Sequence, residues 1–405
     1  MTTLGLSGSY WRLWSASTLA NLGDGVREAA MPLVAAAITR DPLIVAGVMV
    51  AQRLPWLLVG IPAGALLDSA DPRKVSGVAN WVRAGALGAL AMGLLVGVAP
   101  VWLLLAVVFT VGAGEIVADS VAIVAIPELV DDRQLQRANG LMSSGQIVTN
   151  EFLGPPLGGA LFVVGAAVPV ITDAGLLAIA GALLLTLPRT LRGSEDVRPA
   201  GATRELVGRR IGEGIRVVRA NRSLRRLALG TTILAAVDAA WFALLVLFVG
   251  DELRLNDAAF GLLLAVGALG GLLGALLADR LTDARVGRQL AGALIVTAAA
   301  QVAIGLTASV MIVAAALAVS SGAFAVFNIA AVTARQRLAP KGTLGRVTTT
   351  IRTVVESGAA LGALGGGLLA TAFGLRAPML LTAPLLLIAA ALGLQVRVAG
   401  GRPAA

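Results

Sequence analysis

The chain has 405 residues, of which 57% are hydrophobic and only 14% are charged. An average soluble domain has roughly a quarter of its residues charged, so this composition excludes an ordinary soluble protein and indicates a multi-span membrane protein. The net charge is +9, but most arginines lie in one segment and in short loops between apolar runs, which favours membrane lipid over nucleic acid as a partner. The sequence has no cysteine and no histidine, so proton coupling would have to use carboxylates.

Twelve apolar runs are each long enough to cross a bilayer as a helix, which takes about 20 residues. Residues 1–10 have no cleavable signal pattern, so we expect the first span to stay in place. The sequence predicts an all-α integral membrane protein with 12 transmembrane helices, divided into an N-terminal six-helix bundle (1–187), a cytosolic basic linker (188–223) and a C-terminal six-helix bundle (224–405). The predicted spans are 10–38, 43–67, 75–98, 101–126, 139–165, 168–187, 224–249, 258–278, 290–306, 310–334, 347–373 and 378–396.

Charged residues inside the predicted spans are the candidate working parts. A charge at mid-membrane costs at least ~2.5 kcal/mol on insertion scales, so each one needs a partner or a cavity. In the first span, Asp24, Arg27 and Glu28 are three and four residues apart, which places them on one face of a helix. The other candidates are Arg53 in the second span, Arg83 in the third, Glu115 and Asp119 in the fourth, Glu151 in the fifth and Asp238 in the seventh.

A proton-coupling hypothesis follows from these charges. Asp24 or Glu28, together with Glu151, would alternately bind a proton and a polar or cationic part of a substrate, with Arg27 or Arg53 as the switching partner. Two carboxylates close together in a low dielectric cannot both stay charged at low cost, so one of them is expected to take a proton.

Glu115 and Asp119 form a second candidate pair, since they are four residues apart. Static ion pairs that only hold helices together are the alternative for all of these charges. Asp173, near the outer end of the sixth span, is expected to be an entrance residue rather than a proton carrier.

The two halves of the chain repeat one loop element. The stretch Gly64-Ala-Leu-Leu-Asp68 runs on to Arg73 and Lys74 after the second span, and Gly274-Ala-Leu-Leu-Ala is followed by Asp279 and Arg280 after the eighth. Similar elements at equivalent places imply a duplicated six-helix unit.

The fifth span combines glycine with proline. Its motif consists of Gly145, Gly154, Pro155, Gly158 and Gly159. Glycine lets helices approach closely, and proline frees a carbonyl and bends the helix, which suits a place where two bundles move against each other. The alternative is a tight helix contact with no bearing on transport direction.

The segment 188–226 contains eleven arginines and four acidic residues. Within it, Leu206, Val207, Ile211, Ile215 and Val218 recur at helical spacing, which predicts an amphipathic helix on anionic lipid of the inner leaflet. The remaining basic loops fall on the same side of the spans, so the positive-inside rule predicts that both termini are cytosolic, with the protein in the inner (plasma) membrane.

Polar and aromatic residues of the seventh and tenth spans could form a wall of a mostly apolar pocket. Simple helix packing is the alternative for the aromatic residues. The residues are Asp238, Trp241, Phe242, Phe324, Phe327 and Asn328.

Taken with these elements, several short motifs resemble the major facilitator superfamily, and more narrowly its drug:proton antiporter branch, which includes macrolide efflux proteins and the enterobactin exporter. The motifs stand in the same order along the whole chain. They are the loop at 64–74, Pro127-Glu-Leu-Val130, Ala138-Asn-Gly-Leu141, Glu213-Gly-Ile215, Phe260-Gly261, Asn328, Gln336-Arg-Leu338 and Gly345-Arg-Val347.

The resemblance implies roles for two of the motifs. In that family the loop aspartate, matched by Asp68, caps a neighbouring helix and pairs with basic residues as a conformational latch. Arg73 and Lys74 match its basic end, but Ser69 and Pro72 stand where arginines are usual. The glycine-proline motif matches one associated with proton-coupled exporters.

The resulting functional prediction is a secondary active transporter, proton-coupled, that exports an amphipathic drug-like or secondary-metabolite molecule by alternating access. The alternative within the fold is a lysophospholipid flippase or an uptake transporter. An enzyme is disfavoured, because only Glu115 and Asp119 would encourage one. We expect no metal and no cofactor other than the proton gradient, no nucleic-acid partner, and a monomer.

Overall fold

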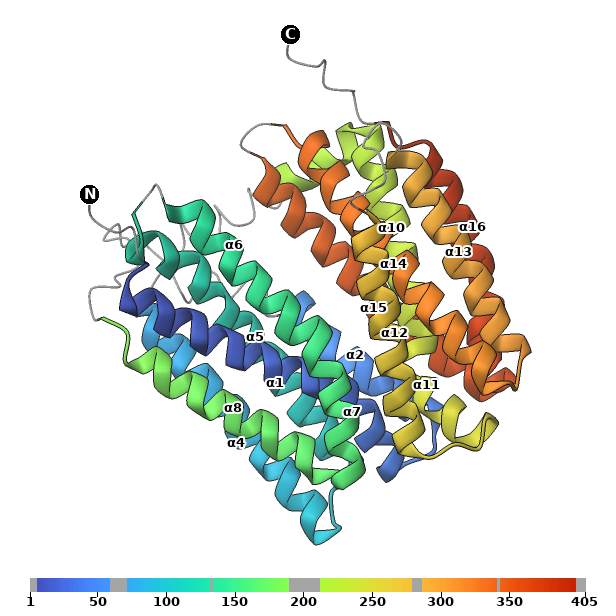
Figure 1. Cartoon of the computed structure of the whole chain (residues 1–405), viewed down its shortest axis with the longest axis horizontal. Helices are drawn as coiled ribbons and strands as arrows, with labels where there is room; N and C mark the ends of the chain where they lie inside the picture. Colours follow the sequence, from blue (N-terminus) through green and yellow to red (C-terminus); the bar gives the residue numbers. More distant parts are fainter. Residues whose placement is uncertain are drawn as a thin grey trace. The chain divides into compact units, whose positions relative to one another are not determined.

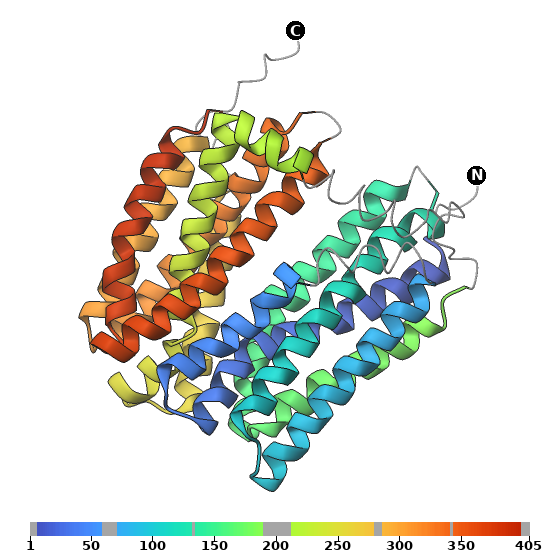
Figure 2. The same ribbon diagram turned by 180° about the vertical axis from the view of Figure 1, so that it is seen from behind.

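The computed structural model describes residues 6–58, 71–131, 134–188, 212–278, 286–340 and 343–397, and every element in these ranges is a helix (Figures 1 and 2). The chain divides into two compact units. Unit 1 comprises Met1–Arg40 and Ala51–Glu205, and unit 2 comprises Asp41–Val50 and Leu206–Ala405. Residues 41–50, which the sequence placed in the N-terminal bundle, belong to unit 2, and the predicted linker is divided between the two units after Glu205.

Unit 1 is organised around its first helix. α1 (Gly8–Ile38) packs against α5, α6, α7 and α8, while α4 packs against α5 and α8. The helices after α1 are α2 (Pro42–Leu58, whose second half belongs to unit 1), α4 (Pro72–Val96), α5 (Val101–Leu129), α6 (Leu135–Gln146), α7 (Gly154–Val164) and α8 (Ala167–Leu185).

Aromatic side chains at the start of α1 bind it to α6. The Tyr10 hydroxyl donates to the Ala138 carbonyl at 2.8 Å, and the Trp14 indole N–H donates to the Leu141 carbonyl at 3.0 Å. Such interhelical hydrogen bonds are a usual means of association in membrane bundles, where lipid is as apolar as leucine. They fix the register of α1 in the bundle.

The predicted fifth span is one helical segment with a change of winding in the middle. α6 passes into a π-helical stretch, η2 (Ile147–Leu153), and then into α7. Pro155 and Pro156 lie just after the π-helical stretch and lack backbone N–H groups, so the α-helical ladder cannot continue through this point. The wider winding at η2 is a weak point where the helix can bend.

Unit 2 is built from α10 (Arg222–Phe242), α11 (Leu245–Leu247), α12 (Asp257–Ala278), α13 (Val286–Leu306), α14 (Val310–Leu338), α15 (Leu344–Phe373) and α16 (Ala377–Leu394), with a π-helical turn η3 (Phe248–Glu252). α13 packs against α14 and α16, and α10 against α15 and α16. The core between α10, α13, α14 and α16 is apolar, with Leu227, Leu294, Phe327 and Leu386 among its members.

Ten helical segments of the described residues are long and apolar enough to cross a membrane. The two other predicted spans correspond to α1 and α2. α1 is 31 residues long, but it carries Asp24, Arg27 and Glu28 in its second half. α2 is described over 17 residues and ends where the described residues end.

The last part of the predicted linker is described and forms a helix at 212–220. Val218 joins an apolar cluster with Leu224 and Val347, and Glu213 pairs with Arg346 of α15 at 2.7 Å. Val218 therefore packs on protein, whereas the sequence predicted that it would face lipid. Ile215 is exposed, and Leu206, Val207 and Ile211 lie outside the described residues.

Candidate functional site

Five charged side chains from four helices gather inside unit 1. They are Asp24 and Arg27 of α1, Arg83 of α4, Glu115 of α5 and Asp173 of α8, and we call them the buried charge network. Arg83 and Asp173 are completely buried and Asp24 and Arg27 almost so, whereas 23% of the Glu115 side chain is exposed. Glu115 is therefore the member of the network closest to the surface of unit 1.

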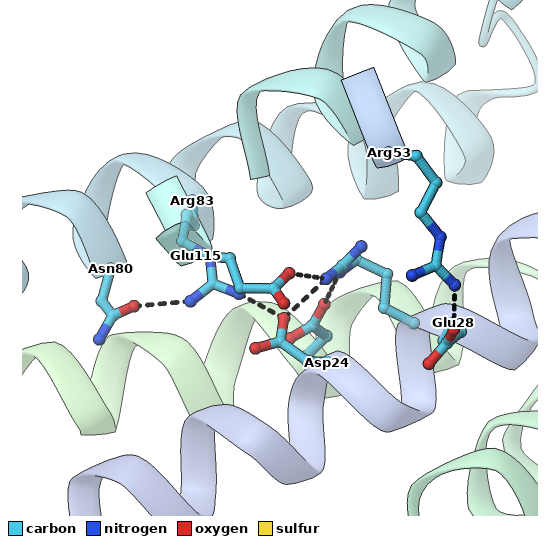
Figure 3. Close-up of polar contacts among 8 residues, drawn as sticks. Asp24, Glu28, Arg53, Asn80, Arg83 and Glu115 are labelled. Atoms are coloured by element: carbon cyan, nitrogen blue, oxygen red, sulfur yellow. Dashed lines mark hydrogen bonds and ion pairs between the residues drawn. The ribbon is translucent and has the colours of Figure 1, made fainter. Parts of the chain in front are cut away.

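Arg27 is shared among three carboxylates on three helices. One guanidinium nitrogen, Nη2, donates to Asp24 Oδ1 at 2.8 Å and to Glu115 Oε2 at 2.7 Å, as Figure 3 shows around Asp24 and Glu115. Its Nε faces Asp173 Oδ2 at 3.6 Å. Because the same side chain serves α1, α5 and α8, a change in the charge of one carboxylate would alter its hold on the other two.

Arg83 is the second cation of the network. It donates to Asp24 Oδ1 through Nη2 and to Asn80 Oδ1 through Nη1, the latter at 2.8 Å (Figure 3). Room for the arginine stem comes from α5, since a Cβ at Gly114 would lie 2.6 Å from Arg83 Cγ. The pairing of Arg83 with Asp24 ties α4 to α1 in a place that water does not reach.

Asp173 differs from the other two carboxylates. Both of its oxygens are buried and neither accepts a hydrogen bond within the described part of the chain, and the Nε of Arg27 that faces it is also unbonded. The carboxylate fits there because position 23 is glycine, where a Cβ would clash with Asp173 Oδ1. The prediction that Asp173 is an entrance residue is wrong, because no part of it is exposed on unit 1.

The network holds more carboxylates than guanidinium groups. Three carboxylates, Asp24, Glu115 and Asp173, face two arginines, Arg27 and Arg83. If all five groups were ionised, their net charge would be −1, and a buried negative charge is costly unless a cation or a proton balances it.

A second ion pair lies nearer the surface. Arg53 of α2 and Glu28 of α1 meet at 3.2 Å, with 31% and 42% of their side chains exposed (Figure 3). Exposed pairs of this kind contribute little to stability, about 0–1 kcal/mol. The pair thus stands apart from the buried charge network in burial, although Glu28 follows Arg27 directly in the chain.

The structure brings four of the predicted intramembrane charges into one network, namely Asp24, Arg27, Arg83 and Glu115. Asp119 lies in α5 and Glu151 in η2, but their side chains are outside what is described. The other two predicted coupling residues, Asp238 of α10 and Asn328 of α14, belong to unit 2.

The aromatic residues proposed for the pocket wall lie mainly in the core of unit 2. Phe327 is buried within the apolar core, and Phe324 packs against the same core. Trp241 is also buried. For these residues the structure therefore shows the alternative that the sequence left open, which is helix packing.

The described residues contain no group of three or more histidine, cysteine, aspartate or glutamate side chains arranged to hold a metal ion. The three carboxylates of the network are separated by the guanidinium groups that bridge them. What this arrangement can do chemically is hold charge and exchange a proton.

Residues 6–404 match the sequence model of one protein family, whose description is transmembrane secretion effector, in the MFS class. The match covers nearly the whole chain. The protein belongs to this family of the major facilitator superfamily (MFS).

Relatives and solved structures agree with that assignment. An uncharacterised MFS-type transporter of Mycobacterium tuberculosis and one of Mycobacterium bovis are each 31% identical over 149 residues, which is 36% of this chain and 33% of theirs. The chain thus matches about one third of the length of these curated relatives.

Several solved transporters share the fold over almost their whole length. A bacterial homologue of the human lysosomal transporter Spinster superposes with a TM-score of 0.76 at 17% identity, covering 96% of both chains. The nucleoside transporter NupG gives 0.73 at 12% identity, covering 96% of this chain and 100% of its own. A bacterial homologue of the iron transporter ferroportin gives 0.71 at 19% identity, covering 96% and 98%. These likenesses show that the chain has the same fold as these proteins, and they identify no substrate.

The predicted MFS latch is described only at its basic end. Arg73 is buried, donates to the Leu187 carbonyl at 3.0 Å and pairs with Asp71 at 3.2 Å, while Lys74 is exposed. Arg73 therefore ties the start of α4 to the end of α8. Gly64, Asp68, Asp279 and Arg280 lie outside the described residues.

The glycine-proline motif of the MFS chain forms a close helix contact. A Cβ at Gly154 would clash with Gly25, and one at Gly158 would clash with the Val26 carbonyl, so the backbones of α7 and α1 touch directly. Gly145 faces Trp14, Gly159 is buried, and Pro155 stands in the first turn of α7. The contact holds α7 against the part of α1 that carries the buried charge network.

Sequence reasoning named Arg83 as an intramembrane charge without giving it a partner, and it assigned Asp173 the wrong environment. Asp173 is the single charge of α8, and Arg83 is the single charge of α4 beyond its first turn. In the fold, each of these charges lies against a glycine that is distant in the chain: Arg83 against Gly114 and Asp173 against Gly23. The sequence alone does not reveal these contacts.

Proposed function

We propose that this MFS protein is a proton-coupled exporter of an amphipathic, drug-like or secondary-metabolite molecule. It would work by alternating access between two six-helix bundles in the inner membrane, with both termini in the cytosol. The buried charge network would bind and release the coupling proton, and no other cofactor would be needed.

The observation that carries this proposal is the buried carboxylate of Asp173. It has no hydrogen-bond partner in the described residues and lies 3.6 Å from the Nε of Arg27. An ionised carboxylate in such a place is expensive, and a proton on it would remove the extra negative charge of the network. Asp173 is therefore our first choice for the proton-binding group.

Proton binding at Asp173 would change the ion pairs that join three helices. Arg27 lies between Asp173 of α8, Asp24 of its own helix and Glu115 of α5. When Asp173 is neutral, Arg27 would be held more strongly toward Asp24 and Glu115. A proton-coupled transporter needs an element that has two arrangements, whose relative populations change when a proton binds. The shared side chain of Arg27 would be such an element.

Glu115 would connect the network to water or substrate, because it is the partly exposed member. Glu28 with Arg53, Asp119 and Glu151 remain candidates for the route that the proton or substrate takes. Asp238 and Asn328 would be the residues of unit 2 that contact the proton or the substrate.

One feature supports export over uptake, and a second supports a bending movement of the fifth span. The family description, secretion effector, concerns outward movement. The glycine-proline motif, which lies against the charged part of α1, adjoins the π-helical stretch where the segment can bend. A bend at this stretch would move α7 relative to α6, together with the glycine contact that α7 makes with α1.

The decisive experiment is efflux from cells that express the protein, measured for a panel of amphipathic compounds with and without a protonophore. We expect at least one compound to be expelled, and its expulsion to stop when the proton gradient is dissipated. Export that ignores the protonophore would contradict proton coupling. Accumulation of the compound inside the cells would contradict export and favour an uptake transporter.

The linker and the oligomeric state are minor parts of the same proposal. We expect the arginine-rich segment 188–226 to lie near anionic lipid of the inner leaflet, and the protein to act as a monomer. Helix 212–220, which is docked on α15 through Val218 and Glu213, would anchor that segment to unit 2.

A further inference from the structure

A groove of about 680 Å³ runs along α14 between α12 and α13, entirely within unit 2. One end is lined by Leu277, Arg288 and Val326, and the other by Gly270, Val296 and Ala318. From Arg288 to Val296 the groove follows eight residues of α13, which at 1.5 Å per residue is about 12 Å.

The groove exists because α12 and α14 meet through glycine. A Cβ at Gly270 would clash with the Ala318 carbonyl, and one at Gly274 would clash with Gly322. The two backbones therefore touch at these glycines, which add no side chain to the groove. On the α13 side the groove is lined by Gly292, around which there is open space: a Cβ there would meet nothing within 4 Å.

The composition of its helices leads us to place the groove within the membrane. α12, α13 and α14 are all candidate spans, and the lining side chain of Leu273 is 61% exposed on the surface of the protein. In a bilayer an apolar surface of this kind is covered by hydrocarbon and not by water. The hydrocarbon core is about 30 Å thick, so a groove of about 12 Å from the interface reaches roughly the end of one leaflet.

Arg288 adds a positive charge to one end of the groove. It lies in the first turn of α13, is exposed, and is one of the lining residues. A guanidinium group binds phosphate oxygens through a planar set of donors, and a basic residue at the interface favours anionic headgroups.

We propose that this groove binds one anionic phospholipid, with its phosphate at Arg288 and one acyl chain along α14 past Gly292. The site is separate from the buried charge network, which belongs to unit 1, and it does not depend on the transport activity proposed above. The proposed orientation of the chain places it in the cytosolic leaflet.

The test is native mass spectrometry of the full-length protein purified in detergent and titrated with phosphatidylglycerol or phosphatidylcholine. We expect one molecule of phosphatidylglycerol to be retained in preference to phosphatidylcholine. Arg288→Gln should weaken phosphatidylglycerol binding about fivefold and leave phosphatidylcholine binding unchanged, since one basic residue near an anionic membrane contributes about that factor. Arg288→Lys should restore most of the preference.

Gly292→Leu tests the acyl-chain part of the site. The new side chain enters open space and replaces glycine with a better helix former, so the fold should tolerate it while the groove is filled. We expect the retained phosphatidylglycerol to be lost. The matched controls are Gly88→Leu, another exposed glycine with nothing within 4 Å, and Arg12→Gln, another exposed arginine near the start of a helix.

Two results with these variants would overturn the proposal. One is that Gly292→Leu retains as much phosphatidylglycerol as the Gly88→Leu control, since the groove would then hold no acyl chain. The other is that Arg288→Gln weakens both lipids equally, since Arg288 would then not read the headgroup charge. Displacement of the bound lipid by a transported compound at stoichiometric amounts would also overturn it, because the groove would then belong to the substrate.

Discussion

The two units of this transporter bury different kinds of polar residue. Unit 1 encloses charged groups, among them Asp24, Arg27, Arg83 and Asp173. In unit 2 the buried polar residues of the described ranges are uncharged: Thr297, Gln301, Ser320 and Thr382. Since a buried charge is far more costly than a buried amide or hydroxyl, the charges in unit 1 are retained against a large penalty.

The two units bury different charges on a similar framework of helix contacts. Both units use glycine in the same way to bring helices together, at Gly154 and Gly158 in unit 1 and at Gly362 and Gly366 in unit 2. The two units therefore share a way of packing helices but differ in the charge that they bury. On the proposed function, unit 1 would be the unit that responds to a proton.

The largest effect is expected where a buried charge loses its partner. Arg83→Met removes the cation that pairs with Asp24 and Asn80, which leaves the Asp24 carboxylate with Arg27 alone. We expect a loss of about 3–5 kcal/mol in the free energy of unfolding. Thermal unfolding of the purified protein in lipid nanodiscs measures it. A loss below about 1 kcal/mol would mean that the network does not stabilise unit 1.

The glycine contacts should be equally sensitive in the two units. Gly158→Val and Gly366→Val each place a side chain against a carbonyl of the neighbouring helix, Val26 and Ala240 respectively. Overpacking of this kind costs about 1–3 kcal/mol. The same thermal assay should give similar losses for both, and almost none for Gly175→Ala, where nothing lies within 4 Å. A loss confined to one unit would contradict a common framework.

The uncharged polar pair of unit 2 should be replaceable. Gln301 Nε2 donates to Thr382 Oγ1 at 3.0 Å, and both residues are buried. Replacing both partners with apolar residues of similar shape, Gln301→Met with Thr382→Val, should change the free energy of unfolding by less than about 1 kcal/mol. The single change Thr382→Val should lower the free energy of unfolding more than the double change does, because it leaves the Gln301 amide without this partner.

The smallest effect is expected at the exposed ion pair of unit 1. Glu28→Gln weakens its contact with Arg53, but both side chains are partly exposed. We expect a change of about 0–1 kcal/mol in unfolding free energy, falling further when salt is added. A loss as large as that of Arg83→Met would remove the distinction between the buried charge network and its surroundings.

Much of this picture could be predicted from the sequence. The apolar runs predicted the membrane fold, and the short motifs predicted the superfamily that the family match then confirmed. The spacing of Asp24 and Arg27 predicted one charged helix face, and the two residues do pair at 2.8 Å. Such features are local, since they depend on residues that are near one another in the chain.

What could not be predicted depends on contacts across the fold. A lone aspartate near the end of an apolar helix can face water, lipid or core, and nothing beside Asp173 in the sequence distinguishes these. Its environment is set by Gly23 and Arg27, about 150 residues earlier in the chain. Val218 was likewise placed on lipid, because the sequence does not reveal that α15 covers it.

The central claim is that Asp173 binds the coupling proton, and infrared spectroscopy tests it most directly. The carbonyl stretch of a protonated carboxylic acid is recorded while the pH around the purified, lipid-embedded protein is varied, for the wild type, Asp173→Asn, Asp173→Glu and Asp24→Asn. We expect a titrating carboxylic-acid band in the wild type, a displaced band in Asp173→Glu, and its loss in Asp173→Asn while the protein remains folded. A band that persists unchanged in Asp173→Asn and disappears in Asp24→Asn would contradict the account and place the proton on α1.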